Sequence, residues 1–266
     1  MKFVSTLFLL LLLAIPLFAT AAEKDGMIFI PGGIYEMGSR KSLMELNPTD
    51  IFNTDRHTLG PEDPAHEVDI DPFYIDMYET TNAQYGEYVK ATGYKASSYA
   101  KNERYNDPQQ PVVGTTWKDA KKYCEWRGKR LPTEAEWEKA ARGKRPVKFP
   151  WGNEMPDDTK ANFDNHLGKT APVGSYPAGK SDYGVFDMSG NVAEWVNDWH
   201  YPEYYIFSPK KNPQGPDKGQ YKVIRGGSWR HDAEDIRLTY RNATIPKLQN
   251  NSVGFRCALS ANDAQQ

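Results

Sequence analysis

The stretch Asp187-Met-Ser-Gly-Asn-Val-Ala-Glu-Trp195 carries the most information about this chain, together with Arg225-Gly-Gly-Ser-Trp229 and Gly254-Phe-Arg-Cys257. In the first stretch two acids flank a Gly-Asn turn, and in the second two glycines precede a serine. The whole sequence is dense in turn formers and aromatics, with 21 Gly, 19 Pro, 7 Trp and 16 Tyr in 266 residues. This composition favours a loop-rich domain held by aromatic packing and bound ions over a helical bundle.

The residues at the ends of three segments predict helices. Each begins after a threonine, whose side-chain oxygen can accept hydrogen bonds from the unpaired amides of the first turn. Each ends at a glycine, the residue that most easily leaves a helix in a left-handed conformation. The three pairs are Thr81 with Gly93, Thr116 with Gly128, and Thr133 with Gly143.

Short strands are predicted where apolar residues alternate, in residues 27–38 and 66–76. Residues 39–64 and 201–220 are polar and irregular, and we expect exposed loops there. No internal repeat or linker divides the chain. We therefore expect one domain over residues 26–260, followed by a short tail at 261–266.

The N-terminus has the pattern of an export signal over residues 1–21. Lys2 gives a positive start, an apolar run extends from Phe3 to Phe18, and small residues follow it. The run is short for a membrane span and contains Pro16. We expect a cleaved signal and a periplasmic or secreted mature protein without a further membrane segment, with a retained anchor as the alternative.

Charge and cysteine content narrow the function classes. The net charge of −2, with both signs interspersed, gives no electrostatic reason to expect nucleic acid or an anionic lipid surface as a partner. The only two cysteines are Cys124 and Cys257. In an oxidising compartment a disulfide between them is the default expectation.

Five motifs occur in one order: Arg130-Leu-Pro-Thr-Glu-Ala-Glu-Trp-Glu138, Phe149-Pro-Trp-Gly-Asn153, Gly190-Asn191 with Glu194-Trp195, Arg225-Gly-Gly-Ser228, and Gly254-Phe-Arg-Cys257. That order resembles the sulfatase-modifying-factor family, whose best-known member is the formylglycine-generating enzyme. The likeness extends from about Met27 to Leu259 and implies an α+β, C-type-lectin-like fold with little regular secondary structure. Cys124 and Cys257 match a disulfide-forming pair of that enzyme.

The resemblance also implies a structural calcium site. The matching positions are Asp187 and Glu194 through their side chains, and Gly190 and Val192 through their carbonyls. Calcium takes six to eight hard oxygen ligands, which two acids around a Gly-Asn turn can supply in part. The alternative is that the two acids lie on a solvated turn.

A second calcium site of the family matches Asn162 and the carbonyl of Phe163. Its remaining ligands fall in a stretch that is shorter in this chain. Asp164 or Asn165 could replace them.

One departure from the family concerns its chemistry. The formylglycine-generating enzyme uses two cysteines after its Gly-Gly-Ser to bind copper(I) and engage the substrate thiol. Aligned from Ser228, those positions hold His231 and Ile236. Copper(I) requires soft thiolate ligands, so the sequence argues against a copper(I) centre and leaves any other transition metal open.

The region after the second motif is the expected substrate groove. We take Ser228 and His231 as the candidate catalytic residues, with His231 as a general base or a metal ligand. The alternative is a hydrogen-bonded histidine in a groove that has lost its catalysis. The other groove residues, which could equally form a salt-bridged surface, are Trp229, Arg230, Asp232 and Arg237.

These observations lead to three functional hypotheses. The first is an exported maturation or modification factor of oxidoreductase type that acts on a partner protein or peptide without the cysteine pair. The second is a non-catalytic, calcium-stabilised module that binds a ligand or protein. The third and weakest is a formylglycine-generating oxidase with an unrecognised arrangement.

Overall fold

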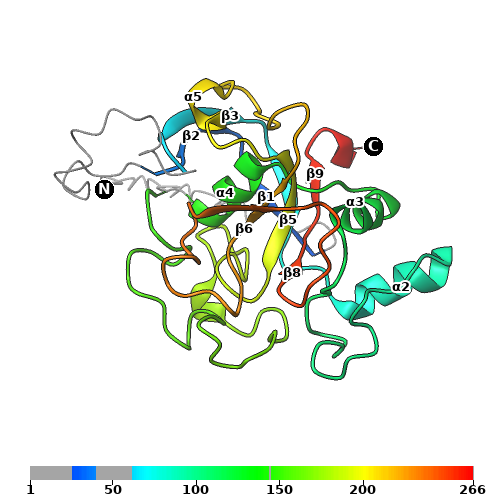
Figure 1. The fold of residues 1–266 in the computed structure, drawn as a ribbon. Coiled ribbons are helices and arrows are strands. Elements are labelled where there is room, and N and C mark those ends of the chain that lie inside the picture. Colours follow the sequence, from blue (N-terminus) through cyan, green and yellow to red (C-terminus); the bar gives the residue numbers. More distant parts are fainter. Residues whose placement is uncertain (1–25, 40–61, 144, 266) are drawn as a thin grey trace, which may run out of the picture.

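The computed structural model describes residues 26–39, 62–143 and 145–265. The expected export signal at residues 1–21 lies outside the described residues, as does most of the expected loop at 39–64. Figure 1 shows a mixed architecture in which short strands and helices are joined by long irregular segments. This agrees with the low content of regular secondary structure that the turn-rich sequence predicts.

The strands of the described residues form three small sheets. In the first, β1 (Met27–Ile30), β4 (Phe73–Asp76) and β9 (Ala258–Ser260) lie in the order β1-β4-β9, with antiparallel neighbours. The first and last strands of the described chain therefore share one sheet. In the second, β2 (Gly33–Met37) pairs with β3 (His66–Ile70). The expected strands at 27–38 and 66–76 are thus confirmed.

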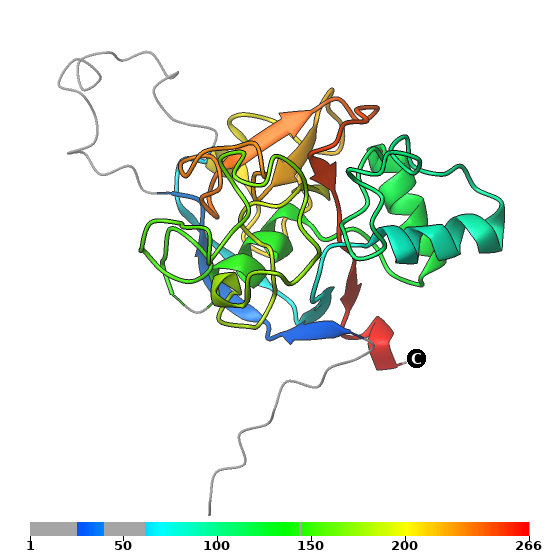
Figure 2. The same ribbon diagram turned by 90° about the horizontal axis from the view of Figure 1, so that it is seen from below.

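The third sheet carries the sequence motifs. Its order is β7 (Arg241–Thr244), β6 (Lys222–Arg225), β5 (Ala193–Trp199) and β8 (Val253–Gly254). The pair β5–β8 is parallel, whereas β6 is antiparallel to both of its neighbours. Figure 2 shows the chain after β6 at the end of the molecule opposite to β1 and β9.

The helices α2 (Asn82–Thr92), α3 (Trp117–Trp126) and α4 (Glu134–Arg142) all begin with the expected caps. In each, the threonine oxygen accepts from the third helical amide, and the side chain at that position bonds back to the threonine amide. Helices α2 and α3 lie together at one side of the molecule (Figures 1 and 2).

Three shorter helices complete the described part of the chain. The 3-10 turns η2 (Pro177–Gly179) and η3 (Asp263–Gln265) lie in loops, and α5 (Tyr204–Phe207) lies in the segment expected to be an exposed loop. That expectation is wrong at Tyr204 and Tyr205, which are buried. The sequence around these two tyrosines is polar and gave no sign that they pack into the core.

Helix α4 is buried on all sides, between the β2–β3 sheet and the β5–β6 strands. Its carboxylates face buried arginines: Arg225 contacts Glu138 at 2.6 Å, and Arg241 contacts Glu134 at 2.8 Å. These charges are paired and hydrogen-bonded, as charges inside a protein must be. Arg225 of the Arg-Gly-Gly-Ser motif therefore supports the core and not the groove.

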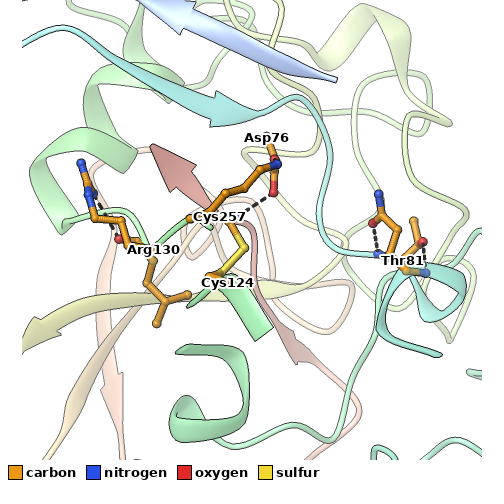
Figure 3. Close-up of a disulfide and its surroundings, with 8 residues drawn as sticks. Asp76, Thr81, Cys124, Arg130 and Cys257 are labelled. Carbon is orange, nitrogen blue, oxygen red and sulfur yellow. Dashed lines mark hydrogen bonds and ion pairs between the residues drawn. A yellow bond between two sulfur atoms is a disulfide. The ribbon is translucent and has the colours of Figure 1, made fainter. Parts of the chain in front are cut away.

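The disulfide between Cys124 and Cys257 is present and buried, as expected (Figure 3). It joins α3 to the residue before β9, across 133 positions of sequence. The amide of Cys257 also donates to Asp76 of β4 at 3.0 Å. The disulfide therefore links the α2–α3 side of the molecule to the β1-β4-β9 sheet.

Candidate functional site

The segment from Asp187 to Val192 forms a tight turn against Asn162. Asp187, Gly190 and Asn191 all have positive φ, at 57°, 85° and 55°. A side chain at Gly190 would place its Cβ 2.4 Å from the carbonyl oxygen of Asn162. Only glycine permits this close approach. The Gly-Asn pair of the motif is thus required by the contact between two distant segments.

Three buried carboxylates surround this turn: Glu79, Asp187 and Glu194. Burial, reinforced by the negative charges of Asp187 and Glu194, raises the pKa of Glu79 well above its usual range. Burial also raises the pKa of Asp187 to about 6, although the N–H of Gly174 and the charge of Arg256 oppose the rise. When all three carboxylates are ionised, their negative charge exceeds the positive charge of the side chains around them.

Arg256 is the cation within this cluster. Its guanidinium donates to both oxygens of Glu194, at 2.7 and 2.8 Å, and to main-chain carbonyls at residues 76, 77 and 186. The indole N–H of Trp137 also donates to Glu194, at 2.9 Å. Glu194 thus serves first as the counter-ion of a fully buried arginine.

Glu79 stabilises the turn at 187–192 by hydrogen bonds. Its two oxygens accept from the side-chain amide of Asn191 at 2.6 Å and from the main-chain N–H of Val192 at 3.1 Å. Sequence reasoning missed both Glu79 and Arg256 as site residues. Arg256 lies inside a quoted motif, but nothing local to Glu79 in the sequence reveals that it meets residues more than a hundred positions away.

The acids at this turn have the charge and the oxygen chemistry that calcium requires, but their side chains do not converge as a ligand set. Three carboxylates against the one guanidinium of Arg256 leave two negative charges uncompensated when all are ionised. Within the described ranges, no three His, Cys, Asp or Glu side chains converge closely enough to hold a metal. Because Arg256 already engages Glu194, the expected ligands left to hold calcium would be Asp187 and the carbonyls of Gly190 and Val192.

The second expected site contains an unsatisfied ligand atom. The side-chain oxygen of Asn162 is buried and accepts no hydrogen bond within the described part of the chain. Its amide nitrogen donates to the carbonyl of Lys169 at 2.9 Å and to Asn191 at 3.2 Å. A buried acceptor without a partner costs free energy, and a cation would satisfy it. The carbonyl of Phe163, the other expected ligand, accepts from the amide of His166 at 3.1 Å.

Asp164 and Asn165 were expected to replace the missing calcium ligands. Instead, their main-chain amides bind the segment that contains Trp229 and His231. The amide of Asp164 donates to the carbonyl of His231 at 2.8 Å, and that of Asn165 donates to the carbonyl of Trp229 at 2.7 Å. Both residues have positive φ, which turns the chain sharply at this point. No contact among the described residues places the side chain of Asp164 or Asn165 beside Asn162 as a further ligand.

The structure brings Ser228 and His231 together in a turn, called the 228–231 turn below. Nδ1 of His231 lies 3.0 Å from the main-chain nitrogen of Ser228 and 2.8 Å from its hydroxyl oxygen. The main-chain N–H can only donate, so Nδ1 must accept, and the neutral ring carries its proton on Nε2. Burial lowers the pKa of His231, which keeps the ring neutral at pH 7.

This geometry limits what the pair can do. A serine hydroxyl beside an imidazole nitrogen resembles an activated nucleophile, but Ser228 is fully buried and cannot meet a substrate in this conformation. Within the described residues, Nε2 of His231 has no hydrogen-bond partner, and the side chain is half-buried. The group of this pair that can reach a ligand is therefore the Nε2–H donor of His231.

The other expected groove residues do not converge. Trp229, expected to line the groove, is only 4 % exposed and packs in the core with Tyr105, Val113 and Val192. Arg237 forms a two-bond ion pair with Glu62 at 2.8 and 3.0 Å. The cavity that Arg237 lines includes neither Trp229 nor His231.

Two charged groove residues have local roles. The carboxylate of Asp232 accepts from the amides of Glu234 and Asp235, which shapes the following turn. Arg230 is exposed and lies over the ring of Trp229 at 4.7 Å. Of the predicted groove, Ser228, Arg230 and His231 remain as one local cluster.

Ile236, at the position of the family's second cysteine, is fully buried. It packs in a cluster with Phe149, Ala161 and Phe163. The two described cysteines are both in the disulfide, so no free thiol exists in the described chain. The position that would carry a metal-binding thiol instead belongs to the core.

Comparison with known proteins identifies the frame on which this site is built. The family profile described as "Sulfatase-modifying factor enzyme 1-like domain" matches residues 16–261. The chain belongs to the sulfatase-modifying-factor family. The formylglycine-generating enzyme of Streptomyces coelicolor is 33% identical over 298 aligned positions, which cover 89% of this chain and 90% of that protein.

A second relative in the sulfatase-modifying-factor family is much longer. A protein of Chlamydia caviae named serine/threonine-protein kinase pkn1 is 37% identical over 252 positions, covering 87% of this chain. This chain spans only 37% of that protein's length. The likeness therefore concerns the shared domain.

Among solved structures, PvdO from Pseudomonas aeruginosa superimposes with a TM-score of 0.71. It is 29% identical and covers 90% of this chain and all of the other. Together with the sheets and helices above, this establishes the α+β, C-type-lectin-like fold of the family. Among the described residues, no helix is long and apolar enough to cross a bilayer.

Proposed function

We propose that this chain is a maturation factor that acts outside the cytoplasm on a partner protein or peptide, without a copper-bound thiol pair. The 228–231 turn is the contact point, and the Nε2–H of His231 donates a hydrogen bond to a carbonyl or carboxylate of the partner. Membership of a family of modifying factors, with relatives named formylglycine-generating enzyme, supports this class of activity.

The observation that carries the proposal is the fixed orientation of His231. Two contacts from Ser228 hold Nδ1, so the ring is held in one tautomer before a partner arrives. A donor fixed in advance loses little conformational entropy on binding. The neutral ring can hold a polar group in place or relay a proton at Nε2.

Export is supported by two separate features. The apolar run of residues 3–18 has the pattern of a signal segment. The disulfide joining Cys124 to Cys257 is of a kind that persists in oxidising compartments. Mass spectrometry of the mature protein from its native host would locate the cleavage site, which we place after Ala21.

The calcium expected at Asp187 and at Asn162 would be structural in this function. Bound there, it would supply positive charge to the buried carboxylates and would fix the turn at 187–192. The chain's own contribution is the frame: Glu79 and Arg256 hold the turn, and Asn191 connects it to Asn162.

The test compares exported peptides from strains that lack the gene or carry variants of it. A peptide whose mass depends on the gene should appear, and wild-type protein should restore it, while His231→Ala should not. The exposed Trp126→Ala on α3 serves as a matched control and should restore it fully. Full restoration by His231→Ala would contradict the role given to this ring.

A non-catalytic binding module is the second candidate. The full burial of Ser228 and Ile236 favours it, because neither position offers a reactive group. In this case the partner binds and dissociates with no change of mass. A formylglycine generator, the third, is tested with a Cys-x-Pro-x-Arg peptide, oxygen and copper, where we expect no conversion of thiol to aldehyde.

A further inference from the structure

A cavity whose lining includes no residue of the 228–231 turn lies beside the edge strand β7. It has a volume of about 620 Å³, within the range typical of small-molecule sites. We call it the tyrosine cavity. The lining residues used below are His200, Tyr201, Lys218, Gln220, Tyr221 and Asn242.

Two half-exposed aromatic rings form the apolar walls of the tyrosine cavity. Tyr201 is 47% exposed and Tyr221 is 46% exposed. The ring of Phe207 lies 5.8 Å from that of Tyr201 and extends the apolar surface outward. Exposed rings grouped at a cavity are typical of a binding site, because they offer a flat face for stacking at little entropic cost.

Main-chain contacts fix the backbone at both rings. The carbonyl of Tyr221 accepts from the amide of His200 at 2.9 Å. The carbonyl of Tyr201 accepts from the guanidinium of Arg241 at 3.1 Å. Arg241 is itself buried and bound to Glu134. The backbone that carries both rings is therefore fixed before any ligand binds, and it is joined through Arg241 to the buried charges of α4.

The charges around the tyrosine cavity select the ligand. Among the described residues, none that lines this cavity is an acid. Burial, together with the charge of Arg241, lowers the pKa of His200 to about 4, so this ring is neutral at pH 7. The charge of Arg241 is matched by Glu134, whereas Lys218 forms no ion pair within the described residues. The lining thus offers one uncompensated positive charge and neutral polar groups.

We propose that the tyrosine cavity binds a small aryl carboxylate, with its ring against Tyr201 and Tyr221 and its carboxylate near Lys218. Gln220, Asn242 and His200 provide neutral hydrogen-bonding groups around the ring. A cationic ligand is disfavoured, because no carboxylate among the described lining residues could pair with it. This site is independent of the proposed function at the 228–231 turn.

The test uses 4-hydroxybenzoate as the probe and 4-hydroxybenzyl alcohol as its neutral counterpart, with dissociation constants measured by calorimetry or ligand-observed NMR. We expect the carboxylate to bind more tightly than the alcohol. Tyr201→Ala and Tyr221→Ala should each weaken binding about tenfold, since each removes one face of the stack. Lys218→Met should weaken binding of the carboxylate but not of the alcohol.

Two control variants distinguish binding in the tyrosine cavity from binding elsewhere on the molecule. Trp126→Ala removes an aromatic ring of similar exposure, 40%, outside the cavity and should leave binding unchanged. His231→Ala should also leave it unchanged, which distinguishes this site from the 228–231 turn. Equal binding of the acid and the alcohol, no binding by the wild type, or equal losses in Trp126→Ala and Tyr221→Ala would each overturn the proposal.

Discussion

Asn162 and Asn191 are hydrogen-bonded to each other twice. The main-chain N–H of Asn191 donates to the carbonyl of Asn162 at 2.8 Å, and the side-chain amide of Asn162 donates to the side-chain oxygen of Asn191 at 3.2 Å. Asn162 is an expected ligand of the second calcium site, and Asn191 lies in the turn that carries the expected ligands of the first. An ion bound at either site would therefore restrain the other through this pair.

Removal of calcium should lower the thermal stability of the protein. A ligand that binds only the folded state stabilises it by mass action, so we expect EDTA to lower the melting temperature by several degrees, on the order of 3–6 °C. Asp187→Ala should reduce or abolish this sensitivity, and Asn162→Ala should reduce it. Differential scanning calorimetry with and without added calcium measures the effect.

The control for this experiment is Glu87→Ala, which removes an exposed acid on helix α2. It should respond to EDTA as the wild type does. If Asp187→Ala retains the full response, calcium is not held at this turn.

Loss of the disulfide should be costly. The loop-closure estimate for a bond across 133 positions is about 4–5 kcal/mol of unfolding free energy, before any strain is subtracted. We expect Cys124→Ala/Cys257→Ala to show a loss of this order in chemical denaturation. Thiol labelling of the unreduced wild type should recover no free thiol, and recovery of two would mean that the bond is absent in solution.

Glu194→Gln should be far more damaging than the removal of a surface charge. The change takes from Arg256 the carboxylate that binds it twice, inside the core, and such a loss typically costs about 3–5 kcal/mol. Glu125→Gln breaks the exposed pair with Lys121 and should cost no more than about 0.5 kcal/mol. Urea denaturation of both variants gives the comparison. Equal effects would contradict the counter-ion role.

His200 should make stability depend on pH. Its folded pKa is depressed to about 4 from an unfolded value near 6.5. The unfolded chain therefore takes up a proton first, and the contribution of this ring is present above pH 6.5 and lost as the pH falls towards 4.

The measurement is the difference in unfolding free energy between wild type and His200→Gln across this range. We expect that difference to shrink as the pH falls from about 6.5 to about 4. A difference that stays constant would show that His200 does not titrate in this window.

Local signals in the sequence were sufficient for the helix starts. The caps at Thr81, Thr116 and Thr133 depend on residues three positions apart, so the sequence alone predicts them. The disulfide was also predictable, because only two cysteines exist. The family motifs located the turn at Asp187 and the pair of Ser228 and His231.

The remainder of the site depends on contacts between distant segments. Glu79 meets Asn191 and Val192 across more than a hundred positions, and no spacing in the sequence indicates it. Trp229 was expected in a groove, but Tyr105 and Asn251 enclose it in the folded chain. Whether a tryptophan lines a groove or fills a core is decided by such partners, which the sequence does not identify.

The β1-β4-β9 sheet gathers both ends of the described chain on one side of the molecule (Figure 2). The segment that follows β6, with the 228–231 turn, lies at the opposite pole. A fusion partner or surface linkage joined at residue 26 or residue 265, the ends of the described chain, would thus leave that pole pointing outward. Either end of the described chain is therefore a suitable attachment point for immobilised assays or display.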